Sequence, residues 1–193
     1  WYTQNGEAQD VMLVGELPTP TPQAGEVLVR LATSGVNPSD VKSRRARPLT
    51  DPLVVPHSDG AGVIEAVGDG VPASRVGERV WVWNGQWQRP MGTCAQYIAL
   101  PGAQAVALPD GTDFAAGACM GIPGLTAMQA VILAERLAGD LRGQTVLVTG
   151  ASSAVGHYIT QMVCLAGGRV IGTVGSEAKA VHAKSAGMEE AIF

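Results

Sequence analysis

The hydrophobic pattern of the chain changes near residue 110, and this change limits the folds that the sequence can adopt. Before that point, short apolar runs alternate with glycine and proline at 11–17, 26–33, 62–67, 79–83, 95–100 and 105–108. Such evenly spaced strands are typical of a β-sandwich or a β-barrel. One short helix is predicted to interrupt them, with Asn37 as its N-cap and Pro38 as its first residue, because these residue types favour those positions.

After residue 110 the periodic segments become longer. Helices are predicted at 112–120 and 125–137, followed by a strand at 145–149, a helix at 154–166, a strand at 169–174, a helix at 177–186 and a strand that starts at 191. Strands that alternate with helices at this spacing indicate a parallel sheet with right-handed crossovers. The predicted fold class is therefore α/β, with a β-rich domain followed by part of a doubly wound parallel sheet.

Composition excludes several classes of protein. The chain has 193 residues, of which 46% are hydrophobic, and this argues against a disordered chain. Its net charge of −4 predicts no attraction to nucleic acid or to an anionic membrane. Three cysteines without a paired spacing predict neither a disulfide framework nor a metal motif, which favours the reducing cytoplasm. The uncharged stretch at 114–134 is interrupted by Pro123 and is read as a buried loop and helix rather than a membrane span.

The turn at 148–156, with the sequence VTGASSAVG, lies between a predicted strand and a predicted helix. In a dinucleotide fold this turn must be tight and must direct a helix N-terminus at the pyrophosphate. Gly150 and Gly156 suit these two tasks, and residues 152–155 are small enough for a phosphate to approach. Ser152, Ser153, Ala154 and Val155 are therefore predicted to bind the cofactor. The alternative is a turn kept small only for packing.

The end of the second predicted strand indicates which nicotinamide cofactor is used. An NAD site usually has an acidic residue there, but this chain has the sequence GTVGS at 172–176. Ser176 and Lys179 follow at the next helix N-terminus, where a hydroxyl and a cation suit a 2′-phosphate. NADPH is therefore favoured over NADH, although Glu177 between them would repel the phosphate.

Other chemistry-bearing residues give weaker signals. His57, His157 and His182 show no metal-binding spacing, so the protein is predicted to bind no zinc. Trp81 and Trp83 are predicted to lie in the barrel core, and Trp87 could instead stack on a flat substrate. The basic run at 42–47 is read as a solvated face or, alternatively, as part of a cleft for the cofactor phosphates.

Five motifs occur in an order that matches a known family: SGVNPSD at 34–40, PHSDGAGVIEAVG at 56–68, GERV at 77–80, GIPGLTA at 121–127 and the turn at 150–156. On these motifs the chain resembles the zinc-independent, zeta-crystallin-like quinone oxidoreductases of the medium-chain dehydrogenase/reductase superfamily. The resemblance implies a chaperonin-10-like (GroES-like) β-barrel domain at 1–124. It also implies the N-terminal part of an incomplete Rossmann NADP-binding domain at 125–193, so that the chain would be a truncated piece of a longer enzyme.

The resemblance also places individual residues. It puts Asn37 and Ser58 where zinc-dependent relatives carry a cysteine and a histidine ligand, and the third ligand position falls near Ile122 or Pro123, none of which suits zinc. The implied cofactor contacts are Lys42, Thr126, residues 152–155, Gly175, Ser176 and Lys179. Family members often have tyrosine at the position of Lys42, so that this contact departs from the family pattern.

The implied activity is hydride transfer from NADPH to a quinone or another α,β-unsaturated carbonyl. Asn37 is the leading candidate for a hydrogen-bond donor to the developing oxyanion, supported by Asp40. The alternative reading of these two residues is a helix N-cap and an ordinary acid of the first turn. We expect a cytoplasmic homodimer as the full-length protein, with a small-molecule substrate and no nucleic-acid or membrane partner. Two further hypotheses remain: an enoyl reductase that acts on acyl thioesters, and a non-catalytic, crystallin-like NADPH-binding protein.

Overall fold

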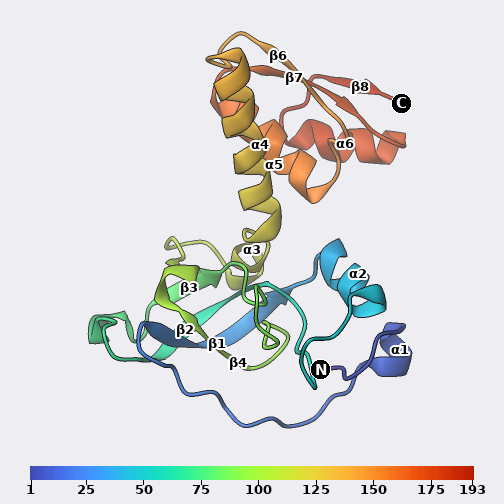
Figure 1. The fold of residues 1–193 in the computed structure, drawn as a ribbon. Coiled ribbons are helices and arrows are strands. Elements are labelled where there is room, and N and C mark those ends of the chain that lie inside the picture. Colours follow the sequence, from blue (N-terminus) through green and yellow to red (C-terminus); the bar gives the residue numbers. More distant parts are fainter. The chain divides into compact units, whose positions relative to one another are not determined.

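The computed structural model describes residues 1–193 and divides into two compact units, Trp1–Ile122 and Pro123–Phe193. Each unit has a hydrophobic core of its own. Antiparallel strands dominate the first unit, and a parallel sheet with helices forms the second (Figure 1). The change of pattern near residue 110 therefore corresponds to a real change in architecture.

A five-stranded sheet forms the core of the first unit, in the order β4-β1-β2-β3-β5. Its strands are β1 Glu26–Gly35, β2 Asp59–Val67, β3 Arg79–Val82, β4 Tyr97–Pro101 and β5 Ala105–Ala107. All neighbouring strands are antiparallel. The core contains side chains from every one of these strands: Val27, Val29, Ile64, Val80, Val82, Ile98, Leu100 and Ala105. The strands predicted from the evenly spaced apolar runs after residue 25 are confirmed.

Short helices precede, connect or follow these strands. They are α1 Ala8–Val11, α2 Pro38–Ala46, α3 Phe114–Ala118 and the 3₁₀ turns Ala73–Arg75 and Gly102–Gln104. The prediction for α2 is confirmed: Asn37 is its N-cap with extended backbone, and Pro38 is its first residue. Helix α3 is shorter than the predicted 112–120, because Asp113 caps it by accepting a hydrogen bond from the Ala116 amide at 2.7 Å.

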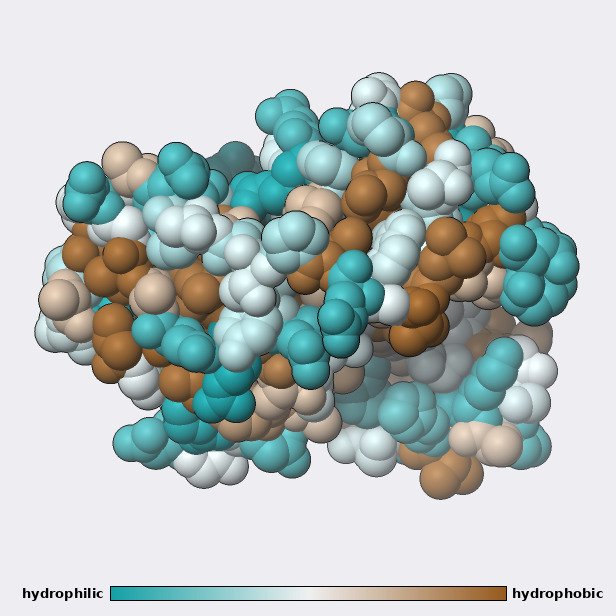
Figure 2. Space-filling view, turned by 90° about the horizontal axis from the view of Figure 1, so that it is seen from below, coloured by the Kyte–Doolittle hydropathy of each residue, from teal (hydrophilic) through white to brown (hydrophobic).

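The strand predicted at 11–17 is wrong. The amides of Asp10 and Val11 both donate to the Glu7 carbonyl, which closes the helical turn α1 where the strand was expected to start. Beyond it, Leu13 and Val14 are exposed, so neither apolar side chain supports a buried strand face. Figure 2 views this lower side of the molecule and shows apolar groups scattered among polar ones. Proline at positions 18, 20 and 22 also removes backbone donors from the segment that follows.

The prediction that Trp81 and Trp83 lie in the barrel core is also wrong. Val80 and Val82 are fully buried and occupy the core face of β3, whereas Trp81 is only half-buried. Successive side chains of a strand point to opposite faces, so the two valines exclude the tryptophans from the core. The Trp83 indole instead donates to the Ala103 carbonyl at 3.3 Å, and Trp87 is exposed.

The second unit contains a parallel sheet in the order β6-β7-β8. Its elements are α4 Ile122–Ala138, which begins at the last residue of the first unit, then β6 Thr145–Val148, α5 Ala154–Leu165, β7 Arg169–Thr173, α6 Glu177–Ser185 and β8 Glu190–Ile192. Helices α5 and α6 lie on the same face of the sheet (Figure 1). Val148, Val163, Val170 and Ala183 are buried between the layers. The predicted strand–helix–strand–helix–strand order is confirmed.

Helix α4 is apolar over much of its length. Val131 and Ala134 pack against the core of the second unit, while Met128, Leu133 and Leu137 are exposed. None of the helices combines the length and the apolar character that a membrane span requires.

Candidate functional site

A buried polar cluster lies at the N-terminus of α2 in the first unit. The Asn37 amide N–H donates to Asp40 Oδ2 at 2.7 Å. The side-chain Nδ2 of Asn37 donates to Asp59 Oδ2, also at 2.7 Å. All three side chains are buried, and we call these residues the Asn37 cluster. Asn37 and Asp40 are both predicted from the sequence as site residues, and the structure brings them together.

Asp59 is the functional candidate that the sequence analysis missed. Its carboxylate also accepts the Ile122 amide N–H, at 2.9 Å and 3.0 Å from its two oxygens. Only 1% of the residue is exposed. Burial raises the pKa of Asp59 to about 6, against the opposing effect of its hydrogen bonds from Asn37 and Ile122. The sequence contained a signal for Asp59. The resemblance places Ser58 at the histidine of a His-Glu pair in zinc-dependent relatives, so Asp59, the next residue, occupies the position of the glutamate.

The arrangement separates two roles that the sequence left open for Asn37. The helix cap is completed by Asp40, which accepts from the Asn37 backbone, and burial raises the pKa of this Asp40 carboxyl. The Asn37 side chain, which takes part in the capping box with Asp40, donates through Nδ2 to Asp59. One Nδ2 hydrogen is used in that bond, and an amide group carries two. Asn37 is therefore a donor whose orientation is fixed by a buried carboxylate.

A second set of hydrogen bonds lies beside the Asn37 cluster. The Ser34 hydroxyl oxygen is 2.9 Å from His57 Nδ1 and 3.0 Å from Thr93 Oγ1. Thr93 donates to the Asp59 carbonyl at 2.6 Å. Burial lowers the pKa of His57, although the charge of Asp40 opposes this shift. The imidazole of His57 is thus joined to the backbone of Asp59 through two hydroxyl groups.

The next feature is the set of residues at the positions where zinc-dependent relatives carry their metal ligands. Asn37 lies in the cluster just described, and Ser58 is half-buried. No three His, Cys, Asp or Glu side chains of the chain gather closely enough to hold a metal ion. The residues present therefore do not fit a zinc centre of protein ligands.

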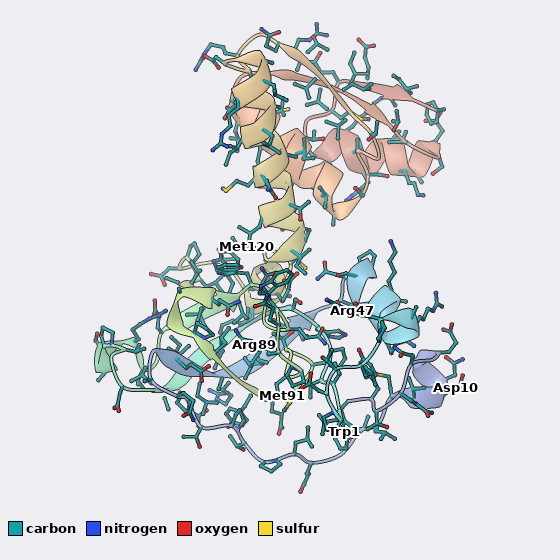
Figure 3. The ribbon with its side chains drawn as sticks, in the orientation of Figure 1. Trp1, Asp10, Arg47, Arg89, Met91 and Met120 are labelled. Atoms are coloured by element: carbon teal, nitrogen blue, oxygen red, sulfur yellow. The ribbon has the colours of Figure 1, made fainter.

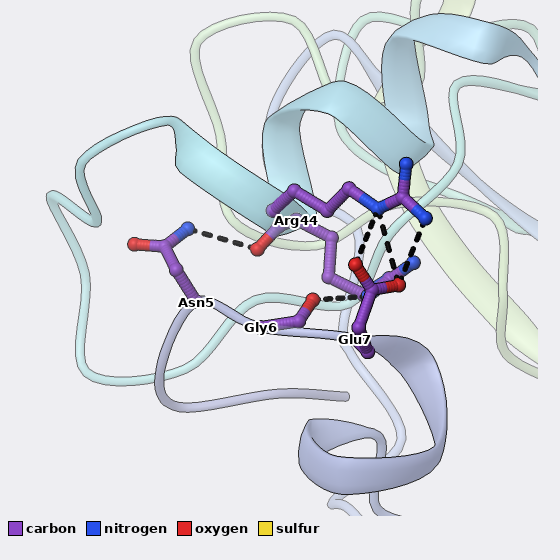
Figure 4. A network of polar contacts seen from close by, with 5 residues as sticks. Asn5, Gly6, Glu7 and Arg44 are labelled. Carbon is purple, nitrogen blue, oxygen red and sulfur yellow. Dashed lines mark hydrogen bonds and ion pairs between the residues drawn. The ribbon is translucent and has the colours of Figure 1, made fainter.

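Two of the basic residues at 42–47 are bound to the N-terminal segment. The Arg44 guanidinium donates to the Gly6 carbonyl, and Arg45 forms an ion pair with Glu7 at 2.9 Å (Figure 4). The Asn5 side chain donates to the Arg44 and Arg47 carbonyls, at 2.9 Å each, and so covers the C-terminus of α2. Arg44 is buried, whereas Lys42, Arg45 and Arg47 are exposed, so most of the basic run is a solvated face that also holds α2 in place. Lys42, a predicted cofactor contact, is exposed on α2.

The β6–α5 turn, residues 149–153, is the candidate cofactor site in the second unit. Ser153 is the N-cap of α5 and accepts the Gly156 amide at 3.0 Å. The amides of Ser152, Ala154 and Val155 have no acceptor within the protein. Free amides at a helix N-terminus bind anions, and the helix dipole adds to this preference. The predicted residues 152–155 thus present donors that a pyrophosphate can use.

Close packing gives this turn its shape. A Cβ added to Gly156 would lie 2.3 Å from the Gly150 carbonyl oxygen, so only glycine allows α5 to approach the turn. Gly150 has a φ of +68°, a conformation that favours glycine. Its amide donates to Thr173 Oγ1 at 2.9 Å, and the Ala151 amide donates to the Thr173 carbonyl at 3.1 Å. These bonds join the turn to the end of β7.

The predicted 2′-phosphate residues lie at the β7–α6 junction. Ser176 is the N-cap of α6 and accepts the Lys179 amide at 3.4 Å. A Cβ built on Gly175 would lie 3.9 Å from Lys179 Nζ, so the ammonium group folds back over the junction. Gly175, Ser176 and Lys179 are exposed, as is Glu177. The second unit contains both groups of predicted cofactor residues, those of the β6–α5 turn and those of the β7–α6 junction. Thr173, at the end of β7, connects the two groups through its bonds to the turn. Thr126 is also exposed in this unit, on α4.

Two hollows in the first unit are lined by other residues. One, of about 290 Å³, is lined by polar side chains that include Arg47 and Arg89 (Figure 3). The other, of about 870 Å³, lies between residues 14–20 and β4, with Trp1 and Met91 in its lining (Figure 3). Neither is lined by a member of the Asn37 cluster.

Comparisons with known proteins agree with this architecture. Residues 23–110 match the model of the alcohol dehydrogenase GroES-like domain. The quinone oxidoreductase of Rattus norvegicus is 35% identical over 174 residues, which cover 89% of this chain and 51% of the rat protein. The chain is a homologue of the quinone oxidoreductases of the medium-chain dehydrogenase/reductase superfamily, which it matches over 89% of its own length.

Solved structures of the superfamily share the fold. A mycobacterial protein solved in complex with NADPH has a TM-score of 0.82 and 32% identity, over 99% of this chain and 57% of that one. The quinone oxidoreductase of Coxiella burnetii has a TM-score of 0.87 and 25% identity, over 100% of this chain and 60% of that one. The predicted combination of a GroES-like domain and a Rossmann-like parallel sheet is confirmed. The chain spans about half the length of the curated quinone oxidoreductases that it matches.

Proposed function

We propose that the whole protein transfers hydride from NADPH to a quinone or another α,β-unsaturated carbonyl. The observation that carries the proposal is the β6–α5 turn, whose amides at Ser152, Ala154 and Val155 have no acceptor within the protein. Relatives named quinone oxidoreductase and a structural neighbour in complex with NADPH support it. The GroES-like domain, which we place at 1–124, would act on the acceptor. Residues 125–193 would form the N-terminal part of the cofactor domain.

The second unit would distinguish NADPH from NADH. Its β7 strand ends in Thr173 without an acidic side chain for a ribose hydroxyl. Lys179 Nζ and the Ser176 hydroxyl would bind the 2′-phosphate, since a cation and a hydroxyl are both donors to phosphate oxygens. The carboxylate of Glu177 opposes this binding, which limits the preference to a moderate one.

The first unit would stabilise the charge that forms on the acceptor. When bound, NADPH supplies the hydride, and negative charge then develops on the acceptor's carbonyl oxygen. Asn37 Nδ2 is a donor held in orientation by Asp59, and a fixed donor stabilises such an oxyanion without reorganisation. Asp40 would act by fixing the Asn37 backbone. The final proton can come from water, so the mechanism needs neither a metal ion nor a dedicated acid.

The test is NADPH oxidation by the whole protein, followed by absorbance, with a panel of quinones, enones, acyl thioesters and alcohols. We expect turnover with quinones or enones that a metal chelator does not reduce, and weaker turnover with NADH. Loss of activity with the chelator, or reaction with alcohols alone, would contradict the proposal. Turnover with acyl thioesters only would identify an enoyl reductase, and tight NADPH binding with no turnover would identify a non-catalytic protein.

We also propose that the whole protein is a homodimer, and that it lies in the cytoplasm because its three cysteines show no paired spacing. Light scattering of the purified whole protein should give twice the mass of one chain, and a monomer mass would contradict this.

A further inference from the structure

His57 has a backbone conformation that a histidine rarely adopts. Its φ is +75°, in the left-handed region, where a residue with a Cβ is strained and glycine is not. Strained backbone of this kind persists only where the surrounding structure enforces it, and it is concentrated at functional sites. The choice of a histidine at this position, where glycine would be unstrained, therefore calls for a reason other than the path of the backbone.

The neighbouring loop enforces this conformation. Backbone hydrogen bonds of 2.8–3.0 Å join residues 55–57 to residues 90–94: Val55 to Pro90, Gly92 to Val55, Thr93 to His57 and Cys94 to Pro56. Gly92 presses against the same segment, since a Cβ there would lie 2.2 Å from the His57 carbonyl oxygen. A glycine at position 57 would satisfy these contacts without strain. The imidazole is thus an addition that the backbone does not require.

The ring is held by one of its nitrogens and leaves the other free. Nδ1 is 2.9 Å from the Ser34 hydroxyl, whereas Nε2 has no hydrogen-bond partner in the protein. Nε2 is not a buried unsatisfied atom, because the only such atom in the chain is His157 Nδ1. It therefore reaches solvent. His57 is also close enough to Asp40 for each to shift the other's pKa, which puts the ring beside the Asn37 cluster.

The hydroxyl groups determine what Nε2 can do. Thr93 uses its proton on the Asp59 carbonyl, so its oxygen can accept but not donate elsewhere. The Ser34 proton can go to Thr93 or to His57 Nδ1, and the Asp59 carbonyl is a more distant third acceptor at 3.5 Å. When it goes to Nδ1, a neutral imidazole carries its own proton on Nε2 and is a donor there. Since burial lowers the pKa of His57, the ring is mainly neutral at pH 7.

We propose that His57 Nε2–H is a second hydrogen-bond donor to the carbonyl oxygen of the acceptor, with Ser34 as the positioning residue that fixes the tautomer. This inference rests on the proposed reductase function and adds to it. Asn37 and His57 would together form an oxyanion site with two donors, both oriented by bonds that end on Asp59. Acceptors with an exposed carbonyl oxygen would be preferred to alkenes activated by other groups.

The decisive variant is His57→Gly in the whole protein, because it removes the imidazole and relieves the backbone. We expect the unfolding temperature to be unchanged or higher, whereas kcat with a quinone falls by roughly 100-fold, as expected for loss of one oxyanion donor. Added imidazole should restore part of kcat in His57→Gly and none in the wild type. Ser34→Ala should lower kcat by less, with little change in KM.

Gln88→Gly is the matched control, because Gln88 also has a positive φ, of +56°, and lies outside the Asn37 cluster. It should relieve strain and leave kcat unchanged. If His57→Gly keeps full kcat, or loses it together with stability and without rescue by imidazole, the His57 proposal is overturned while the reductase function stands. If the wild type oxidises no NADPH with any acceptor, the proposed function fails, and the His57 proposal fails with it.

Discussion

The two units build their candidate sites from different parts of the chain. In the first unit the donors are side chains, and buried carboxylates and hydroxyls fix them: Asn37 by Asp59, and His57 by Ser34. In the second unit the donors assigned to the pyrophosphate are backbone amides, which a turn and a helix N-terminus expose, and only the 2′-phosphate is assigned to side chains. Side-chain donors can be changed one at a time, whereas backbone donors depend on the path of the chain. Substitutions should therefore affect chemistry in the first unit and cofactor binding in the second.

The largest effect is expected from Gly156→Val. A Cβ at this position would lie 2.3 Å from the Gly150 carbonyl oxygen, so α5 must move away from the turn and its amides must lose their arrangement. We expect NADPH affinity to fall by more than about 100-fold, because the anion site depends on those amides. Fluorescence titration with NADPH measures this, and a thermal melt reports the accompanying loss of stability.

Gly124→Ala is the control for this variant, because a Cβ on Gly124 meets nothing within 4 Å. It lies inside α4 and should stabilise the protein by up to about 1 kcal/mol without changing NADPH affinity. Equal NADPH affinities of Gly156→Val and wild type would refute the assignment of the β6–α5 turn.

The next effect concerns Asp59 and pH. Its pKa is raised from 3.8 to about 6 in the folded state, so the folded protein holds a proton that the unfolded chain releases. This contribution to stability is complete below pH 3.8 and is lost as the pH rises through 6, a change of about 3 kcal/mol. Asp59→Asn should remove this dependence, so the difference in unfolding free energy between variant and wild type should change by about that amount between pH 4 and 7.

Denaturant titrations across that range measure the difference, and Asp69→Asn, at an exposed position, serves as the control. A difference that stays constant with pH would mean that Asp59 remains charged when folded.

A smaller effect is expected from Lys179→Glu in the second unit. Its ammonium group folds over Gly175 and is assigned to the 2′-phosphate, so reversing the charge should weaken NADPH by roughly tenfold and NADH by less than twofold. Lys184→Glu, on the same helix α6, is the control and should change neither affinity. Equal losses of affinity for NADPH and NADH would contradict the assignment of Lys179 to the phosphate site.

Local signals made most of the second unit predictable. The apolar run at 145–148 and the alternating helices define its order, and Ser153 and Ser176 stand at N-cap positions that residue type alone indicates. In the first unit Asn37 was also recognised as an N-cap for this reason. These features depend on a few neighbouring residues.

The features that could not be predicted from the sequence depend on packing between distant residues. Asp59 is 22 residues from Asn37, and only folding joins their side chains. The burial of Val80 and Val82 in place of Trp81 depends on which face of β3 meets the core, and both faces carry apolar residues. The positive φ of His57 is imposed by the loop at 90–94, and no local sequence pattern predicts this conformation.

The most direct test of the division between the units is a single-turnover measurement on the whole protein. NADPH is bound at saturation, a quinone is mixed in, and the rate constant of NADPH oxidation is compared in wild type, Asn37→Ala and Lys179→Glu. We predict that Asn37→Ala slows the step by roughly 100-fold with an unchanged NADPH dissociation constant, because one oxyanion donor is lost. Lys179→Glu should react at the wild-type rate once saturated. An Asn37→Ala rate equal to that of wild type, or an equal slowing in both variants, would contradict the account.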